Sequence, residues 1–142
     1  MTGVQTCALP ICLTDYLAPY PDAKIHVHNL GGNIPYEVER MDHRSLLDTP
    51  KEELPSARFR RSKVYVDCNS FGPSAIEAAV RLYGADCIVC GTDGTDFGCE
   101  WTSKALAEAQ IGEDAREKIL HRNASAMLAR VATAAQREKA AA

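Results

Sequence analysis

Three short apolar segments along the chain have the hydrophobic pattern of β-strands. In the first two, β-branched residues alternate with other side chains, whereas the third is almost continuously apolar. A continuous apolar run suits a strand that is buried on both faces, as in a parallel sheet covered by helices. The predicted strands are residues 24–28, 63–67 and 87–90.

Segments with helical periodicity follow the predicted strands. The helix after the second strand begins with Pro73 and is followed by Gly84, the usual positions of these residues at helix ends. The last helix starts with acidic residues, which interact favourably with its dipole. The predicted helices are residues 35–47, 73–83, 102–109 and 113–131, with a short helical turn at 13–17. The polar, proline-containing stretch 49–62 has no clear pattern, and no element is predicted there.

The order of these elements, β-α-β-α-β-α-α, predicts parallel strands joined by right-handed crossovers. Three strands cannot close a barrel on their own. The pattern therefore fits either a small open α/β domain or the last part of a (β/α)8 barrel, whose usual length is about 250 residues.

The composition is that of an ordinary globular protein. The chain has 142 residues, of which 46% are hydrophobic and 25% charged, and its formal net charge is -3. Because acidic and basic residues are interspersed, no basic stripe suggests nucleic acid or a membrane surface as a partner. No apolar run approaches the roughly 20 residues that cross a bilayer, and no secretory signal is recognisable. We therefore expect a cytoplasmic protein with a small-molecule substrate as partner, and homo-oligomerisation stays open.

Six cysteines are too widely spaced for the disulfide framework of a small secreted protein. We expect reduced thiols. Cys87 and Cys90 form a C-x-x-C pattern, but residues three apart on a strand point to opposite faces. Neither a redox nor a zinc role is therefore expected for this pair.

The two ends of the sequence are not expected to belong to the fold. Written back as codons, most of residues 1–12 resembles a sequencing adapter, so we interpret this segment as an adapter-derived or non-native leader. Residues 132–142 are of low complexity, and we expect a frayed tail there. The domain proper is predicted to cover residues 13–131.

Polar residues gather where each predicted strand ends. In parallel α/β folds the functional groups lie at the carboxyl ends of the strands, because loops and helix amino termini converge there. The polar groups at these positions are His28 and Asn29, Asp67 to Asn69, and Thr92 and Asp93. Each also has an ordinary structural explanation, since aspartate commonly caps turns and a histidine at a strand end is commonly hydrogen-bonded.

Three motifs at these positions resemble the amidohydrolase-related family of metal-dependent hydrolases and decarboxylases, which includes the carboxymuconate-semialdehyde and resorcylate-type decarboxylases. Residues 28–35, HNLGGNIP, together with Arg40 and His43, are similar to the segment at the family's sixth strand. Residues 64–67, VYVD, resemble the seventh strand, and residues 88–93, IVCGTD, resemble the eighth.

The resemblance implies a fold and a set of site residues. Together with a similar closing helix over 116–124, it implies the C-terminal portion, about strands six to eight, of a TIM-type (β/α)8 barrel. In the family the aspartate of the eighth-strand motif binds the catalytic metal, which makes Asp93 a predicted metal ligand and proton-transfer residue. His28 is the predicted catalytic acid or electrophile. The implied cofactor is a divalent metal ion, zinc by preference, with manganese as the alternative.

Two departures from the family pattern bear on the site. The family's histidine stands two residues before the first glycine of the Gly-Gly pair, and Asn29 occupies that position here. The family also takes ligands from a His-x-His on its first strand and a histidine on its fifth, which residues 13–131 do not supply. His26 and His28 form a His-x-His themselves, but the Leu-Gly-Gly and proline that follow indicate the sixth strand, and we interpret His26 as structural.

The resulting hypothesis is part of an enzyme. The longer protein would act on a small carboxylated or ring-containing substrate by hydrolysis or non-oxidative decarboxylation. This chain alone is expected to be inactive, because a zinc site normally needs three or four protein ligands. The alternative is a self-standing small α/β binding or interaction domain without catalysis.

Overall fold

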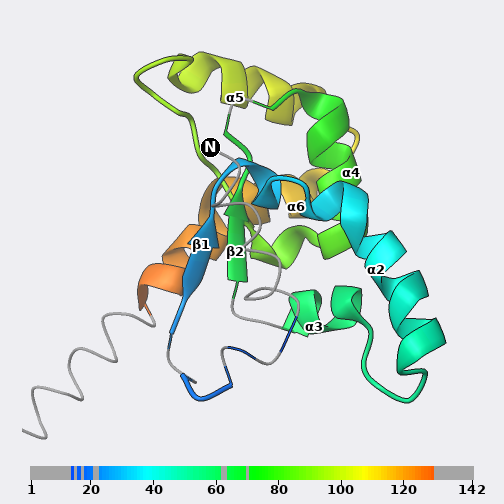
Figure 1. The fold of residues 1–142 in the computed structure, drawn as a ribbon. Coiled ribbons are helices and arrows are strands. Elements are labelled where there is room, and N and C mark those ends of the chain that lie inside the picture. Colours follow the sequence, from blue (N-terminus) through cyan, green and yellow to red (C-terminus); the bar gives the residue numbers. More distant parts are fainter. Residues whose placement is uncertain are drawn as a thin grey trace, which may run out of the picture.

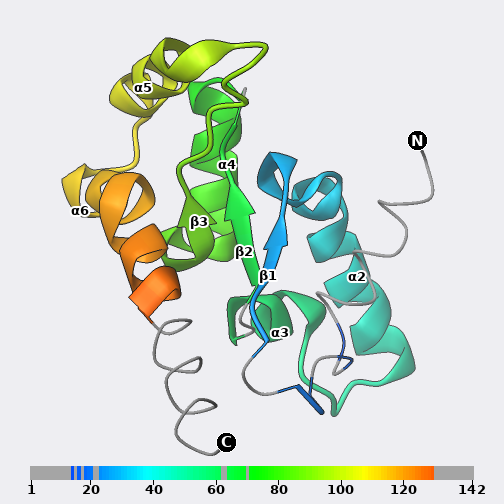
Figure 2. The same cartoon turned by 90° about the vertical axis from the view of Figure 1, so that its left-hand side faces the viewer.

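Three parallel strands lie side by side in the order β1, β2, β3 (Figures 1 and 2). Their bounds are Ile25–Val27, Val64–Asp67 and Ile88–Val89. The predicted order and direction are confirmed, although β1 and β3 are shorter than predicted. The computed structural model describes residues 14, 16, 18–20, 23–61, 64–69 and 71–129. The predicted leader 1–12 and tail 132–142 lie outside these residues, as does most of the turn predicted at 13–17.

Helices α2 to α5 connect and follow these strands, and the last helix is described below. Their bounds are Ile34–Asp48 for α2, Pro55–Arg61 for α3, Pro73–Tyr83 for α4 and Gly98–Glu108 for α5. Helices α2, α4 and α5 confirm the predicted helices to within a few residues at each end. Within the described residues, no helix combines the length and apolar character needed to span a membrane.

Helix α3 shows that the prediction of no element in residues 49–62 was wrong. The helix starts with Pro55, which suits a first helical position. Its one large apolar residue, Phe59, is fully buried, and its ring centroid lies 4.5 Å from that of Tyr83. A single apolar side chain among charged residues creates no periodicity, so tertiary packing rather than sequence pattern specifies this helix.

The last helix is interrupted by a π turn. Helix α6 spans Glu113–Glu117, the turn η4 spans Lys118–Arg122, and the helix continues over 123–129. The N–H of Asn123 donates to the carbonyl of Lys118, five residues back. The carbonyl of Ile119 is then available to accept the N–H of Cys90 at 2.9 Å. The helix predicted over 113–131 is therefore confirmed where it is described. One of its turns has π geometry and hydrogen-bonds to Cys90, next to β3.

The side chain of Asn123 makes further hydrogen bonds to the same region. Its Nδ2 donates to the carbonyls of Ala85 and Ile88, both at 2.7 Å. Ala85 belongs to the short 3-10 turn η3, Ala85–Cys87, which reverses the chain between α4 and β3. Cys87 therefore ends this turn rather than beginning the third strand as predicted.

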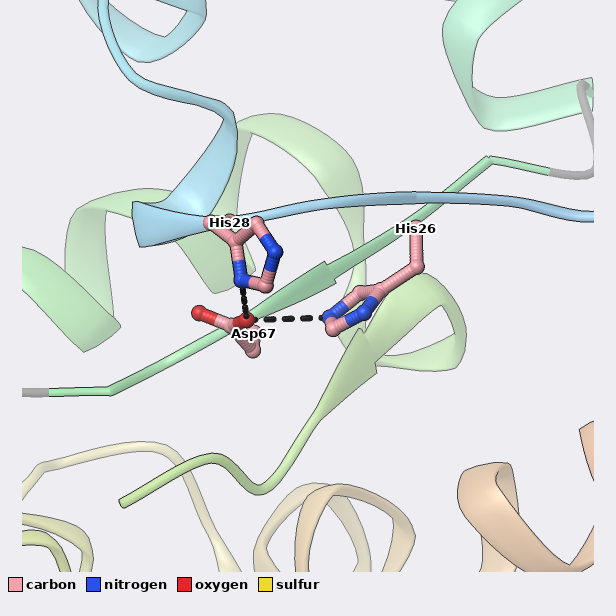
Figure 3. Close-up of side chains that lie close together, drawn as sticks. All are labelled: His26, His28 and Asp67. Carbon is pink, nitrogen blue, oxygen red and sulfur yellow. Dashed lines mark hydrogen bonds and ion pairs between the residues drawn. The ribbon is translucent and has the colours of Figure 1, made fainter. Parts of the chain in front are cut away.

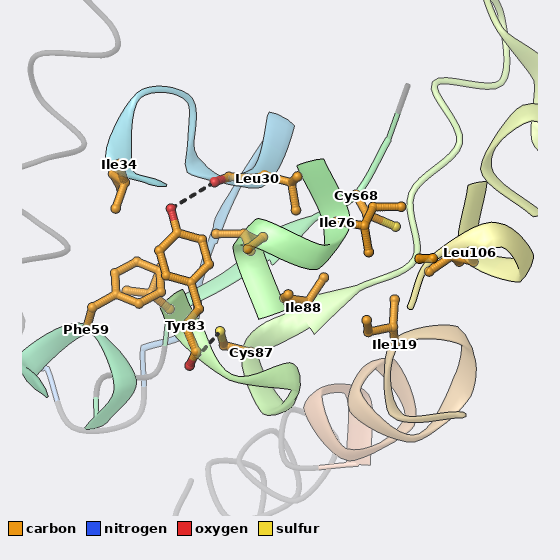
Figure 4. Close-up of a cluster of buried hydrophobic side chains, with 14 of the residues drawn as sticks. Leu30, Ile34, Phe59, Cys68, Ile76, Tyr83, Cys87, Ile88, Leu106 and Ile119 are labelled. Carbon is orange, nitrogen blue, oxygen red and sulfur yellow. Dashed lines mark hydrogen bonds between the residues drawn. The ribbon is translucent and has the colours of Figure 1, made fainter. Parts of the chain in front are cut away.

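The core lies between the sheet and the helices (Figure 4). Along β2 and just beyond it, Val64, Val66 and Cys68 point into the core, whereas Tyr65 and Asp67 point to the opposite face, as the two-residue period of a strand requires. The large apolar side chains on helices that are at most 1% exposed are Ile34, Val38, Phe59, Ile76, Leu106 and Ile119. Burial of each large apolar side chain stabilises the fold by about 1.5–3 kcal/mol.

Candidate functional site

Three side chains converge at the carboxyl ends of β1 and β2 (Figure 3). Nε2 of His26 lies 2.9 Å from Oδ2 of Asp67, and Nδ1 of His28 lies 3.1 Å from the same oxygen. The strand register explains the meeting. His26 is paired with Tyr65, so His28 and Asp67, each two residues further on, project from the same face.

Asp67 is the buried member of this group. Its side chain is 5% exposed, whereas those of His26 and His28 are 39% and 75% exposed. Its second carboxylate oxygen, Oδ1, accepts the backbone N–H of Asn29 at 2.9 Å. Such partners are required because removing an ionised carboxylate from water costs several kcal/mol. The site therefore has a buried acceptor at its base and two imidazole rings that reach solvent.

The loop after His28 has four consecutive residues with a positive φ angle. These angles are 58° at Asn29, 50° at Leu30, 80° at Gly31 and 66° at Gly32. The left-handed conformation costs a non-glycine residue about 1–2 kcal/mol, and the two glycines avoid this cost. The turn directs the N–H of Asn29 to Asp67 and places the side chain of Leu30 in the core.

Gly91 allows the end of β3 to approach Asp67 closely. A β-carbon at this position would lie 2.9 Å from Cβ of Asp67 and 3.3 Å from Cβ of Asn69. The hydroxyl of Thr102 donates to the carbonyl of Gly91 at 3.0 Å and holds it there. Asn69 is 9% exposed, and within the described residues its Oδ1 has no hydrogen-bond partner. A buried acceptor of this kind is suited to a donor from a ligand or from a further segment.

The structure does not bring Asp93 into this group. Among the described residues, the three side chains above are the only set of three or more His, Cys, Asp or Glu residues whose ligand atoms lie within 4.8 Å of one another. Asp93 is exposed in the loop after β3, with φ 50°, and its carbonyl accepts two N–H groups at the turn that leads to α5. Its role as a metal ligand stays a prediction.

Sequence analysis selected His28 for the site and gave Asp67 no role. The structure places His28 in the convergent group, and it places Nε2 of His26, interpreted as structural, 2.9 Å from the same carboxylate. A signal for Asp67 was present, because it ends its strand on the same sheet edge as His28. That signal did not reveal the contact, which depends on the register between two strands.

A pair of thiols lies on the helix side of the sheet. The four described cysteines, Cys68, Cys87, Cys90 and Cys99, are free thiols. The thiol of Cys68 donates a hydrogen bond to the sulfur of Cys90, which raises the pKa of Cys68 and lowers the pKa of Cys90. Burial raises the pKa of Cys87 to about 12.

Solved structures resemble this chain, although no family model and no curated protein sequence matches it. A dihydroxybenzoic acid decarboxylase from Polaromonas sp. JS666, with bound manganese and the inhibitor 2-nitroresorcinol, matches with a TM-score of 0.73 and 26% identity. The match covers 87% of this chain and 39% of that one. A 2,6-dihydroxybenzoate decarboxylase from Rhizobium matches with a TM-score of 0.73 and 22% identity over 87% of this chain and 40% of that one.

A third structure, assigned as an amidohydrolase from Staphylococcus aureus, has a TM-score of 0.73 and 22% identity over 89% of this chain and 41% of that one. This chain has the fold of part of an α/β barrel. It spans about two fifths of the length of the structures that it matches. The assignment of β1, β2 and β3 to the sixth, seventh and eighth strands of the amidohydrolase-type barrel stays a prediction.

Proposed function

We propose that the chain is the C-terminal part of a metal-dependent enzyme that decarboxylates a small aromatic or other ring-containing carboxylic acid without oxidation. The observation that carries the proposal is the likeness to decarboxylases at a TM-score of 0.73, combined with His28 at the carboxyl ends of the strands. Hydrolysis is the second candidate, because one similar structure is assigned as an amidohydrolase. Non-oxidative decarboxylation is preferred because several of the similar structures are decarboxylases.

The residues at this edge of the sheet fit a divalent cation. Carboxylate oxygens are ligands for zinc and manganese in proteins, and Asp93 presents an exposed carboxylate in the loop after β3. Asp93 is the proposed ligand from this chain, and further ligands would come from segments outside residues 13–131. A bound divalent ion supplies positive charge that polarises the substrate and stabilises the negative charge that develops on it.

His28 is the proposed proton-transfer residue. Its side chain is 75% exposed on the substrate side of the sheet, and its Nδ1 is held by Asp67. The other ring nitrogen, Nε2, is therefore free to exchange a proton with a substrate. In a decarboxylation, His28 would deliver this proton to the carbon from which carbon dioxide leaves, and the electrons of the broken bond would stay on the substrate.

The test is an assay of the longest in-frame protein that carries this sequence, supplied with manganese or zinc. Release of carbon dioxide from 2,6-dihydroxybenzoate and 5-carboxyvanillate, the substrates of similar enzymes, would be measured. We expect H28A to lower kcat by about 10²–10⁴-fold, the range for a lost proton-transfer group. We expect D93N to lose bound metal as well as activity, whereas H43A, on the exposed face of α2, serves as the control and retains both.

Two results would count against the proposal. Unchanged metal stoichiometry in D93N would remove Asp93 from the metal site. Activity of H28A equal to that of the unaltered protein would remove His28 from proton transfer. The 142-residue chain alone is expected to release no carbon dioxide from either substrate, because Asp93 is its single proposed metal ligand.

A further inference from the structure

One carboxylate oxygen of Asp67 lies close to ring nitrogens of two histidines. Oδ2 lies 2.9 Å from Nε2 of His26 and 3.1 Å from Nδ1 of His28, and Figure 3 shows the carboxylate between the two rings. Oδ1 is occupied by the N–H of Asn29 at 2.9 Å. Within the described residues, no lysine or arginine pairs with this buried carboxylate. The two imidazole rings are therefore the side chains that face this carboxylate.

The donors and acceptors available at this contact determine which nitrogen of each ring carries the hydrogen. An ionised carboxylate accepts hydrogen bonds and has no hydrogen to donate, so both ring nitrogens that face Oδ2 must be N–H groups. A neutral imidazole has one N–H group and one nitrogen with a lone pair. Neutral His26 is then the Nε2–H tautomer, whereas neutral His28 is the Nδ1–H tautomer.

We propose that Asp67 is the positioning residue of this site and holds His26 and His28 in opposite tautomers. The lone pairs of His26 Nδ1 and His28 Nε2 consequently face away from the carboxylate. His28 Nε2 is the atom that can take up or return a proton at the substrate. This inference rests on the proposed function for the reaction it serves, while the tautomers themselves follow from the contacts alone.

The backbone around Asp67 is built to hold this carboxylate in one place. Two non-glycine residues, Asn29 and Leu30, adopt positive φ angles so that the N–H of Asn29 reaches Oδ1. Strain of this kind persists where the surrounding structure imposes it, and it is concentrated at functional sites. On the opposite side, Gly91 packs directly on the side chain of Asp67. A carboxylate fixed from both sides can set the orientation of two exposed rings.

The tautomers can be measured on the chain as it stands. It contains four histidines, so long-range ¹H–¹⁵N spectra of the ¹⁵N-labelled protein at about pH 8, where imidazole is ordinarily neutral, resolve each ring. We expect Nε2–H for His26 and Nδ1–H for His28, with His43 and His121 as exposed controls. In D67N we expect the Nδ1–H signature of His28 to be lost and its spectrum to approach that of His43. The same tautomer in both site histidines, or an unchanged His28 in folded D67N, would overturn the proposal.

A metal ion bound directly by the three side chains is the competing explanation, and it gives the opposite result. Coordination through His26 Nε2 and His28 Nδ1 would leave both atoms without hydrogen. Titration with Zn²⁺ is therefore expected to leave both N–H groups that face Asp67 in place. Loss of both signals at one equivalent of Zn²⁺ would replace the positioning role with a metal centre.

Two further variants keep the test decisive if D67N does not fold by circular dichroism. In H26A, His28 should keep its Nδ1–H tautomer, and in H28A, His26 should keep its Nε2–H tautomer, because the carboxylate still faces the ring that remains. Reversal of either assignment would contradict the proposal. The tautomer measurement is also independent of the activity assay. A longer protein that shows these tautomers but has no activity would reject the proposed reaction. A longer protein that is active but lacks these tautomers would reject the positioning role.

Discussion

Glycine at position 91 decides how closely the end of β3 can lie against the site. The backbone of Gly91 lies so close to Asp67 and Asn69 that a methyl group on its α-carbon would collide with their side chains. The requirement is steric, because the limiting contacts are with fixed β-carbons rather than with the ends of flexible side chains. The identity of this one residue therefore affects the position of the carboxylate that two histidines share.

We expect G91A to destabilise the fold by about 1–3 kcal/mol, the usual cost of inserting a methyl group into a packed region. Its β-carbon would lie 2.9 Å from Cβ of Asp67, so one of the two must move. G94A is the matched control, because the limiting contact there is the hydroxyl of Thr92 at 3.3 Å, which can rotate away. Urea denaturation measures both variants, and equal free energies of unfolding for G91A and the unaltered chain would contradict the steric argument.

The sulfur of Cys90 should be more reactive near neutral pH than an isolated thiol. The hydrogen bond from Cys68 lowers the pKa of Cys90, so more of it is thiolate at a given pH, and thiolate is the form that reacts with haloacetamides. A variant with Cys7, Cys12 and Cys99 changed to serine leaves Cys90 as the reactive site, because burial keeps Cys87 protonated. The midpoint of labelling against pH should move upward when Cys68 is changed to alanine. A midpoint that stays in place would show that Cys68 does not stabilise the thiolate.

At the residue scale, the sequence predicted His28 as a site residue but did not predict its contact with Asp67. A strand ending in His28 and another ending in Asp67 can be predicted from local patterns. The two residues are 39 positions apart, and their contact depends on the pairing of Ile25 with Val64. Local hydrophobic pattern does not encode that register, because it is set by packing on the helix side of the sheet.

Among the secondary-structure elements, the π turn η4 shows how a helix is fastened to a strand. The turn makes the carbonyl of Ile119 available to the N–H of Cys90, and Asn123 bridges two further carbonyls next to β3. These bonds cover the outer edge of β3, which would otherwise present unpaired backbone groups. Periodicity predicted this helix, but the turn follows from hydrogen bonds to a distant strand and has no local signature.

We expect N123A to lower the free energy of unfolding by about 1–3 kcal/mol, because it leaves two carbonyls without their donor in a buried place. The change should appear as a lower midpoint of thermal unfolding. N33A is the control, since Asn33 precedes α2 on the surface and makes no capping hydrogen bond through its side chain. A larger loss in N33A than in N123A would be incompatible with the bridging role of Asn123.

On the scale of the whole molecule, the fold is an open arc of a barrel. The parallel sheet and most helices could be predicted because apolar periodicity records them directly. Helix α3 could not, because its position depends on Phe59 reaching the ring of Tyr83. Within the described residues β1 has one partner strand, so its other edge displays unpaired N–H and C=O groups, which a closed barrel would satisfy.

We therefore expect the isolated chain to associate with itself. An exposed strand edge is a template for pairing with another chain, and such association typically appears at micromolar to millimolar protein concentrations. The average mass measured by light scattering during gel filtration should rise as the loaded concentration increases from about 10 to 500 µM. A constant monomer mass over this range would mean that the edge of β1 is covered.

The sharing of one oxygen by His26 and His28 has a thermodynamic consequence. Any ligand that changes the contact of one ring with Asp67 also changes the contact left to the other ring. Such coupling is reciprocal: the factor by which a ligand on the first ring alters affinity at the second equals the factor in the reverse direction.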